Sequence, residues 1–242
     1  MKLTTVLFDL DGTLLPMDQE LFVKAYLGGL SKAAASYGYE PETMVKGIMM
    51  GTGAMVKNTG ERTNEEVFWQ VMEGLFGPSI LEDIHIFDEF YKTDFQKIRE
   101  VCGFDPLARE TVMRIREMGL RVSLATNPLF PSVATESRIR WAGLDPEDFD
   151  GFTSYEKSRY CKPNPDYYRD VLKSLGVVAE ECLMVGNDVG EDMVARTLGM
   201  RVFLLTDCMI NRKNEDISAY PHGSYEELLA YVEGEMRGEG DA

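Results

Sequence analysis

Cysteine and histidine are scarce in this sequence, and their spacing gives no sign of a zinc site. The 242 residues include four cysteines and two histidines. No two cysteines form a CxxC pair, and no Cys/His cluster has metal-binding spacing. Free thiols in a reducing cytosol are therefore expected, which predicts a cytoplasmic protein.

Long apolar runs and positive charge are also scarce. No stretch approaches the roughly 18 apolar residues of a membrane span. The first apolar run is interrupted by Asp9 and Asp11, which is unlike a signal peptide. With 41 acidic and 25 basic residues, the formal net charge is -16, so the surface repels nucleic acid and anionic membranes. A small phosphorylated ligand is not excluded, because a local cation can outweigh the distant field.

Apolar residues make up 44% of the chain, which is enough to build a core. Helical patterns follow most of the short apolar runs, as in a parallel α/β sheet. The pairs Asp105-Pro106 and Asn164-Pro165 mark two helix starts. Five runs rich in leucine or β-branched residues are expected to be buried strands: 5–10, 121–126, 151–156, 182–187 and 201–206.

Residues 18–101 break this alternation and show helical periodicity alone. Apolar residues recur there at steps of three and four, which is typical of amphipathic helices that pack on one another. The segment leaves after the first strand and returns before the second. We therefore expect an all-helical insertion at 18–101 in an α/β domain built from 1–17 and 102–242. The last residues, from 237 onward, are expected to fray.

Two aspartates stand where the first predicted strand ends, in the stretch VLFDLDGTLL (6–15). Asp9 and Asp11 are two residues apart, so their side chains project together near the carboxyl end of the strand, where open parallel sheets bind ligands. Gly12 permits the sharp turn that exposes them. Asp-Gly is also a common turn pair. The ends of the other strands therefore decide whether this is a site or a turn.

Those other strand ends carry further polar residues. The fourth strand ends in MVGNDVGEDM, which places Asp188 and Asp192 one helical turn apart. The second ends in LATN, where Thr126 and Asn127 offer a hydroxyl and backbone N–H groups for phosphate oxygens. Lys162, in CKPNP, is a point cation ahead of a predicted helix. Each feature alone is common in turns, helix starts or solvated surfaces. Together they predict an oxygen-rich site suited to Mg²⁺.

Taken in order, these residues resemble the haloacid dehalogenase (HAD) superfamily, specifically its phosphatase branch. The matching residues are DLDGT (9–13), Thr126, Lys162, Asp188 and Asp192. The helical insertion also resembles the C1 cap of that family. The resemblance implies a Rossmann-like core with strand order 5-4-1-2-3, counted along the predicted strands.

The resemblance also implies a role for each motif residue. Asp9 would be the nucleophile that attacks phosphorus and becomes an aspartyl-phosphate. Asp11 would protonate the leaving alcohol and then deprotonate the attacking water. Thr126, the Asn127 backbone and Lys162 would bind the phosphoryl group. Mg²⁺ would be held by the Asp9 side chain, the Asp11 backbone carbonyl and an acid of the fourth motif. The chemistry agrees, since phosphoryl transfer needs positioning and charge neutralisation.

The fourth motif departs from the family pattern. It often reads Gly-Asp, whereas this chain has Gly186-Asn187-Asp188. Either Asp188 is the direct metal ligand, with the chain displaced by one residue, or Asn187 takes that place and Asp192 compensates. The spacing between Asp188 and Asp192 favours Asp188.

Two other functions remain alternatives to a hydrolase of a small phosphorylated metabolite. A phosphomutase of the β-phosphoglucomutase type shares the same catalytic set, and a non-catalytic module that binds a phosphorylated ligand is the less favoured alternative. Asp11 argues against halide displacement, because that chemistry leaves nothing to protonate. A cap over the site favours a small substrate over a phosphoprotein. These residues determine neither the identity of the substrate nor the oligomeric state.

Overall fold

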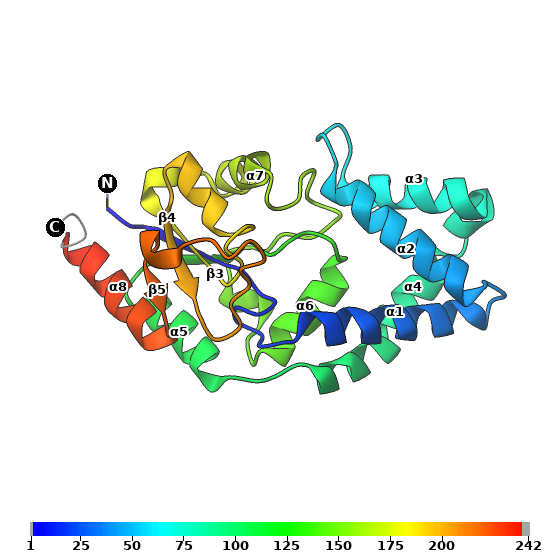
Figure 1. Ribbon diagram of the computed structural model, residues 1–242, viewed down its shortest axis with the longest axis horizontal. Coiled ribbons are helices and arrows are strands. Elements are labelled where there is room, and N and C mark those ends of the chain that lie inside the picture. Colours follow the sequence, from blue (N-terminus) through cyan, green and yellow to red (C-terminus); the bar gives the residue numbers. More distant parts are fainter. Residues whose placement is uncertain (1, 239–242) are drawn as a thin grey trace.

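A parallel sheet lies at one end of the molecule and a group of helices lies at the other (Figure 1). The computed structural model describes residues 2–238. The five strands have the order β2-β1-β3-β4-β5, and every pairing among them is parallel. The predicted α/β class is confirmed. The strands are β1 (Thr5–Phe8), β2 (Arg121–Leu124), β3 (Cys182–Gly186), β4 (Arg201–Leu205) and β5 (His222–Gly223).

Four strands follow the predicted order, but both edges of the sheet differ from the prediction. Residues 151–156 do not form a strand, and Phe152 makes a single parallel bridge to Leu124. The chain follows the edge of β2 only briefly, up to the Thr153 N–H, which donates to the Leu124 carbonyl at 3.2 Å. It then turns away, and the Tyr155 N–H donates to the Phe130 carbonyl at 3.0 Å. The opposite edge is β5, whose two residues are too few to show a sequence pattern.

Helices cover both faces of the sheet because strand side chains alternate between the faces. Val6 and Phe8 belong to the hydrophobic cluster that contains α5 (Pro106–Glu117) and α8 (Tyr225–Arg237). Leu7 belongs to a second cluster with α7 (Pro165–Leu175). The predicted caps are confirmed, since Asp105 begins α5 and Asn164 begins α7, each accepting a backbone N–H at 2.9 Å. The 3₁₀ helices of this part are η3 (Pro146–Asp148), η4 (Ala179–Glu181), η5 (Met193–Leu198) and η6 (Ile217–Ala219).

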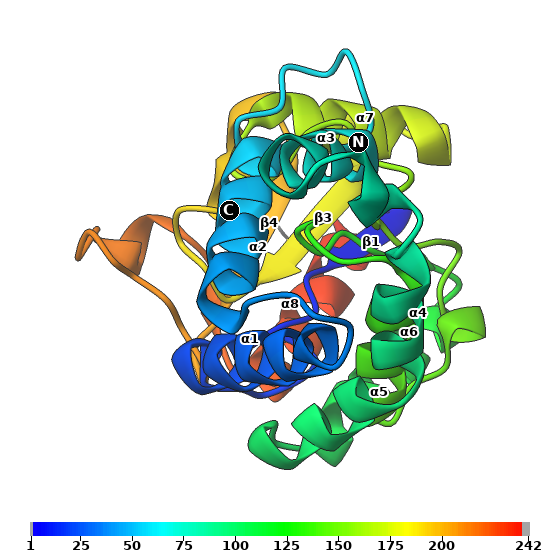
Figure 2. The ribbon, with the colours of Figure 1, turned by 90° about the vertical axis from the view of Figure 1, so that its right-hand side faces the viewer.

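The chain between β1 and β2 is helical, and Figure 2 views the molecule from the end that these helices form. Their two connections to the sheet run side by side. Met17 and Cys102 form an antiparallel bridge, and the Gly103 N–H donates to the Pro16 carbonyl at 2.7 Å. The elements are α1 (Gln19–Ala35), α2 (Pro41–Val56), α3 (Asn64–Phe76), η1 (Pro78–Leu81), α4 (Ile84–Lys92) and η2 (Asp94–Val101).

The remaining helix, α6 (Ser132–Trp141), lies between the sheet and the inserted helices (Figure 1). None of the described helices is long and apolar enough to cross a membrane. The tail that was expected to fray from 237 onward still includes the end of α8 at Arg237 and its cap at Gly238. The rest of that tail, 239–242, lies outside the described residues.

Candidate active site

The turn after β1 holds Asp9 at the carboxyl edge of the sheet. The Asp9 N–H donates to the Val185 carbonyl at 2.9 Å, which continues the ladder to β3. Gly12 has φ +85°, and a Cβ at that position would lie 2.3 Å from Asn187 Nδ2. Both the conformation and the close approach therefore require glycine. The Thr13 hydroxyl lies 3.3 Å from Asp9 Oδ2 and 3.1 Å from Asn187 Oδ1.

Lys162 lies behind Asp9 and is fully buried. Its Nζ is 2.9 Å from Asp9 Oδ1 and 2.6 Å from Asp192 Oδ1. Burial lowers the pKa of Lys162, but the charges of Asp192 and Asp9 outweigh this and hold the pKa well above its usual value. One ammonium cannot neutralise two buried carboxylates, and burial together with the Asp9 charge raises the pKa of Asp192 to about 7.

Asp11 is paired with an arginine that the sequence did not point to. Arg138 of α6 is completely buried, and its Nη1 contacts Asp11 Oδ2. The guanidinium stacks 4.4 Å from the centre of the Phe130 ring, and Thr135 accepts a further hydrogen bond from it at 3.3 Å. Burial raises the pKa of Asp11, and Arg138 opposes that shift. The other oxygen, Asp11 Oδ1, is buried without a hydrogen-bond partner among the described residues.

The residues after β3 form a tight loop around Asp188. Asp188 Oδ1 accepts the N–H groups of Gly190 and Glu191 at 2.8 and 3.0 Å, and Oδ2 accepts from Arg212 at 3.0 Å. Asp192 Oδ2 accepts the Asp188 N–H at 3.0 Å. Both carboxylates of the fourth motif are thus oriented by hydrogen bonds within the loop itself.

Asn187 and Asn127 complete the edge of the site. Asn187 Nδ2 donates to the Cys208 carbonyl at 2.7 Å, and Asn187 Oδ1 accepts from the Thr13 hydroxyl. Both polar atoms of this amide therefore have a partner. Asn127 Nδ2 donates to Glu191 Oε2 at 3.0 Å, whereas Asn127 Oδ1 is buried without a partner among the described residues. The Thr126 carbonyl accepts the hydroxyls of Thr153 and Tyr167, which fixes the loop that carries Asn127.

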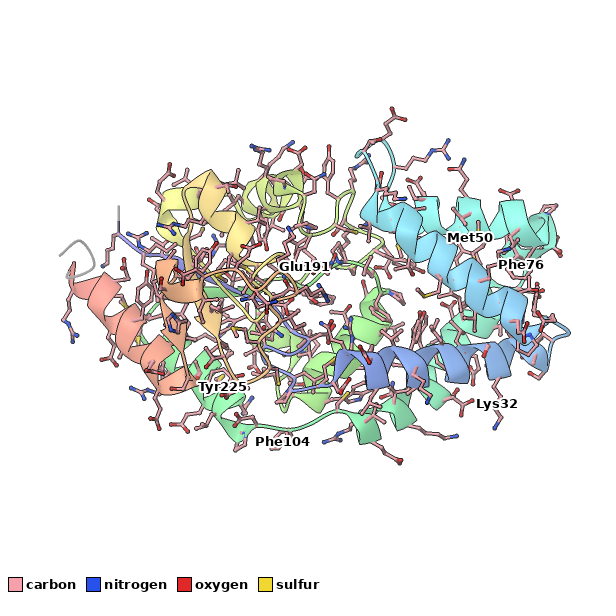
Figure 3. The ribbon with its side chains drawn as sticks, in the orientation of Figure 1. Lys32, Met50, Phe76, Phe104, Glu191 and Tyr225 are labelled. Carbon is pink, nitrogen blue, oxygen red and sulfur yellow. The ribbon has the colours of Figure 1, made fainter. Side chains whose placement is uncertain are left out.

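These side chains meet around one pocket of about 170 Å³ at the carboxyl edge of the sheet. Figure 3 labels Glu191, one of its lining residues, near the middle of the molecule. Lys162 does not line the pocket but lies beneath Asp9 and Asp192. All the other site residues predicted from the sequence line it, namely Asp9, Asp11, Thr126, Asn127, Asn187, Asp188 and Asp192.

The charges around this pocket do not balance. Five carboxylates line it, from Asp9, Asp11, Asp188, Glu191 and Asp192. Three cations contact them, from Lys162, Arg138 and Arg212. With every group ionised, two negative charges remain in excess. Burial raises the pKa of Asp11 and of Glu191, as crowded carboxylates require. A divalent cation would relieve this excess, and carboxylate and carbonyl oxygens are the ligands that Mg²⁺ prefers.

The residues present therefore fit a Mg²⁺ ion in charge and ligand type. Within residues 2–238, however, no three His, Cys, Asp or Glu side chains converge closely enough to hold a metal by themselves. A backbone carbonyl or an oxygen of the substrate must then complete the ligand set.

Arg138 and Arg212 are the contacts that sequence reasoning missed. Arg138 gave no signal in the sequence, because the residues of α6 follow no clear amphipathic pattern, although it is buried there beside Ala134 and Trp141. A charged residue in a buried helix position requires a partner. Arg212 comes from an exposed loop that no periodicity describes.

Comparison with known proteins identifies the family of this chain. The model of the haloacid dehalogenase-like hydrolase family matches residues 3–196. Pyrophosphatase PpaX from Bacillus cereus (strain AH820) is 28% identical over 203 residues, which are 78% of this chain and 76% of that protein. Glyceraldehyde 3-phosphate phosphatase from Pyrococcus abyssi (strain GE5 / Orsay) is 29% identical over 119 residues, which are 46% of this chain and 44% of that protein.

A solved structure shares the fold over almost the whole length. The structure of a HAD phosphatase from Thermococcus onnurineus has a TM-score of 0.59 to this chain at 18% identity, and the match covers 96% of this chain and 99% of that one. The chain belongs to the haloacid dehalogenase-like hydrolases, because the family model covers most of its length. The predicted superfamily and the predicted enzyme class, a HAD-like phosphatase, are both confirmed at this level.

Proposed function

We propose that this protein is a Mg²⁺-dependent phosphomonoester hydrolase that acts on a small soluble phosphorylated metabolite through an aspartyl-phosphate on Asp9. The observation that carries the proposal is the placement of Asp9 and Asp11 in one pocket with Thr126 and Asn127, while Lys162 lies behind Asp9. A carboxylate nucleophile divides a difficult hydrolysis into two easier steps.

In the first step, the Asp9 carboxylate attacks phosphorus and the bond from phosphorus to the ester oxygen breaks. Asp11 donates a proton to that oxygen, so the alcohol leaves neutral. In the second step, Asp11 takes a proton from water, and the water oxygen attacks the phosphorus of the aspartyl-phosphate to release inorganic phosphate and free Asp9. Burial raises the pKa of Asp11 and favours its carrying a proton, while Arg138 fixes one of its oxygens.

Lys162, Thr126 and the Asn127 backbone bind the phosphoryl oxygens in this proposal. Two carboxylates hold Lys162 in its charged form. The Lys162 ammonium therefore offers a fixed positive charge behind the nucleophile, in a region that excludes water and strengthens its attraction for the developing charge.

Mg²⁺ would be held by the Asp9 side chain, the Asp11 backbone carbonyl and Asp188, and when bound it would neutralise phosphoryl charge. Asp188 fits this place better than Asn187 or Asp192. Both polar atoms of the Asn187 amide and both oxygens of the Asp192 carboxylate already make hydrogen bonds within the protein. The Oδ2 atom of Asp188 instead faces Arg212, an exposed side chain that can move away at little cost.

Residues 18–101 act as a cap of the C1 type in this proposal, on a core built from 1–17 and 102–242. Gln19, Phe22 and Val23 of α1 line the pocket together with Asp9 and Asp11. The paired connections at Met17 and Cys102 would let these helices close over the substrate, expel water and reopen for product release.

The proposal is tested by release of p-nitrophenol from p-nitrophenyl phosphate, with Mg²⁺ and with EDTA. We expect Mg²⁺-dependent turnover that falls at least 10³-fold in Asp9→Asn. Acid-quenched wild-type enzyme should carry one phosphoryl group on the peptide that contains Asp9, as read by mass spectrometry. Asp207→Asn is the matched control, since this exposed aspartate follows β4 without lining the pocket and should leave turnover within twofold.

Turnover that survives in Asp9→Asn would contradict the nucleophile assignment. Turnover that is unchanged in EDTA would contradict the metal. Transfer of the phosphoryl group to a second sugar phosphate, without release of inorganic phosphate, would identify a mutase in place of a hydrolase.

A further inference from the structure

A second cavity adjoins the pocket that contains Asp9 and Asp11. It measures about 180 Å³ and lies among α1, α2, α3 and α4 and the loop after β2. Three residues, Val23, Leu129 and Phe130, line both spaces. A ligand whose phosphate lies at Asp9 can therefore extend past these three side chains into the second cavity.

The lining of this cavity is aromatic and lacks positive charge. Rings of Phe68, Trp69 and Phe87 line it, and within the described part of the chain no lysine, arginine or histidine does. Its one charged residue is Asp88, a carboxylate. A leaving group that is itself a phosphate would find no counter-charge here, and a polyhydroxylated sugar would lose most of its hydrogen bonds to water. Cavities of about 150 Å³ with apolar linings hold one benzene ring. This cavity therefore has room for a single six-membered ring.

Two polar groups in the lining provide orientation. Trp69 is 7% exposed, and its buried Nε1–H faces the Tyr155 hydroxyl, another group of the lining, without a hydrogen bond of good geometry. A buried N–H of this kind is better satisfied when a ligand offers a well-placed acceptor. The hydroxyls of Tyr26 and Tyr91 are 2.8 Å apart and share one hydrogen bond. One of their two hydroxyl hydrogens therefore remains to donate to a ligand.

We infer that the leaving group of the substrate is an alcohol that carries one apolar ring. This inference rests on the proposed function and names the substrate class of the same site. The reaction is hydrolysis of the phosphate ester of such an alcohol. The bond between phosphorus and the ester oxygen breaks, the oxygen takes the proton of Asp11, and water supplies the oxygen that leaves with inorganic phosphate. Pyrophosphate and sugar phosphates are disfavoured by the same lining.

The first test compares three phosphate donors on the wild-type enzyme with Mg²⁺: 2-phenylethyl phosphate, glycerol 1-phosphate and pyrophosphate. The first two are esters of primary alcohols, so they differ mainly in what enters the cavity. We expect kcat/KM for 2-phenylethyl phosphate to exceed that for glycerol 1-phosphate at least tenfold, mostly through a lower KM. Equal values, or a preference for either of the other two donors, would overturn the inference while leaving the phosphatase intact.

The second test fills the cavity. Thr52 of α2 lines it without touching the pocket of Asp9, so Thr52→Trp should lower kcat/KM for 2-phenylethyl phosphate at least tenfold and leave glycerol 1-phosphate within twofold. Met50→Trp is the matched control, because Met50 belongs to the same helix, is 48% exposed and does not line the cavity (Figure 3). Equal losses for both substrates in Thr52→Trp, or losses of the same size in Met50→Trp, would contradict the inference.

A binding measurement separates the inference from the proposed function. With Trp141→Phe as background, Trp69 is the one remaining tryptophan of the sequence. Its fluorescence should change on addition of 2-phenylethanol and stay constant with glycerol. If no phosphate donor is hydrolysed, p-nitrophenyl phosphate included, the proposed function fails. This measurement still shows whether the cavity binds an alcohol that carries an aromatic ring. A constant signal with 2-phenylethanol overturns the inference.

Discussion

Lys162 shows how one residue can serve the stability of this molecule and, in the proposed function, its chemistry as well. Its ammonium is fully buried between Asp9 and Asp192. A buried ion pair adds little net stability over an apolar substitute, but removal of one partner leaves an uncompensated charge. Lys162 is therefore needed to keep two carboxylates buried at the bottom of the site, independently of any contact with substrate.

The substitution Lys162→Met should lower the free energy of unfolding by about 3–5 kcal/mol in EDTA at pH 8, and it should abolish phosphatase turnover. The double variant Lys162→Met/Asp192→Asn should recover part of the stability without activity, because one buried charge is gone. Urea denaturation measures the first effect and p-nitrophenyl phosphate hydrolysis the second. Lys173→Met, an exposed lysine of α7, should stay within about 0.5 kcal/mol. A loss below about 1 kcal/mol in Lys162→Met would show that the two carboxylates do not need it.

Among the elements, the start of α3 connects the inserted helices to the sheet domain. Asn64 opens this helix and is completely buried. Its Nδ2 donates to the Pro128 carbonyl and to Cys161 Sγ, both at 3.2 Å, and its Oδ1 accepts from Asn58 at 2.8 Å. Pro128 follows Asn127 and Cys161 precedes Lys162, so one asparagine touches both loops that carry the residues proposed to bind phosphate.

The substitution Asn64→Ala should cost about 2–3 kcal/mol of unfolding free energy, because it leaves several buried polar groups without a partner. We also expect KM for p-nitrophenyl phosphate to rise, since both loops that are proposed to bind phosphate lose an anchor. Gln70→Ala, which removes an exposed amide from the same helix, should change neither quantity beyond about 0.5 kcal/mol or twofold. Unchanged stability in Asn64→Ala would contradict the anchoring role, and urea denaturation with steady-state kinetics measures both effects.

At the scale of the whole molecule, burial suppresses the ionisation of weak acids. Burial raises the pKa of Tyr26 to about 12, of Cys161 to about 12 and of Cys182 to about 11. It also raises the pKa of Tyr91 and Tyr167 above the usual value for tyrosine. Cys161 is therefore an inert thiol despite its position next to Lys162. In the unfolded chain, such thiols and phenols ionise near their ordinary values of about 8.5 and 10.

Stability should therefore fall as the pH rises above about 9. Between the pKa of the unfolded chain and the raised pKa of the folded one, the folded state binds more protons, so the unfolding free energy decreases with pH. Each group that ionises in the unfolded chain alone costs about 1.4 kcal/mol per pH unit. Urea midpoints at constant ionic strength should be steady from pH 7 to 8.5 and decline beyond pH 9. Urea midpoints that stay unchanged up to about pH 10.5 would contradict this account.

Much of the candidate site was predictable because it follows the ends of strands. Asp9, Thr126 and Asp188 each lie within two residues of the end of a buried strand, and the carboxyl ends of parallel strands share one edge. Once the sheet was predicted to be parallel, local sequence was enough to bring these residues together around one pocket. The outer strands were harder to predict. Whether 151–156 and β5 pair as strands depends on the length of the neighbouring strand, which their own sequences do not determine.

By itself, the sequence determined the α/β class, the helical insertion and the residues offered at the sheet edge, because periodicity and strand ends are local properties. Only the tertiary structure decided that Arg138 meets Asp11, that Asn64 joins two loops, and that an aromatic cavity opens beside the site. These contacts join residues far apart in the chain, and no local pattern encodes them. They arise because buried charges and amides must find partners wherever packing places them.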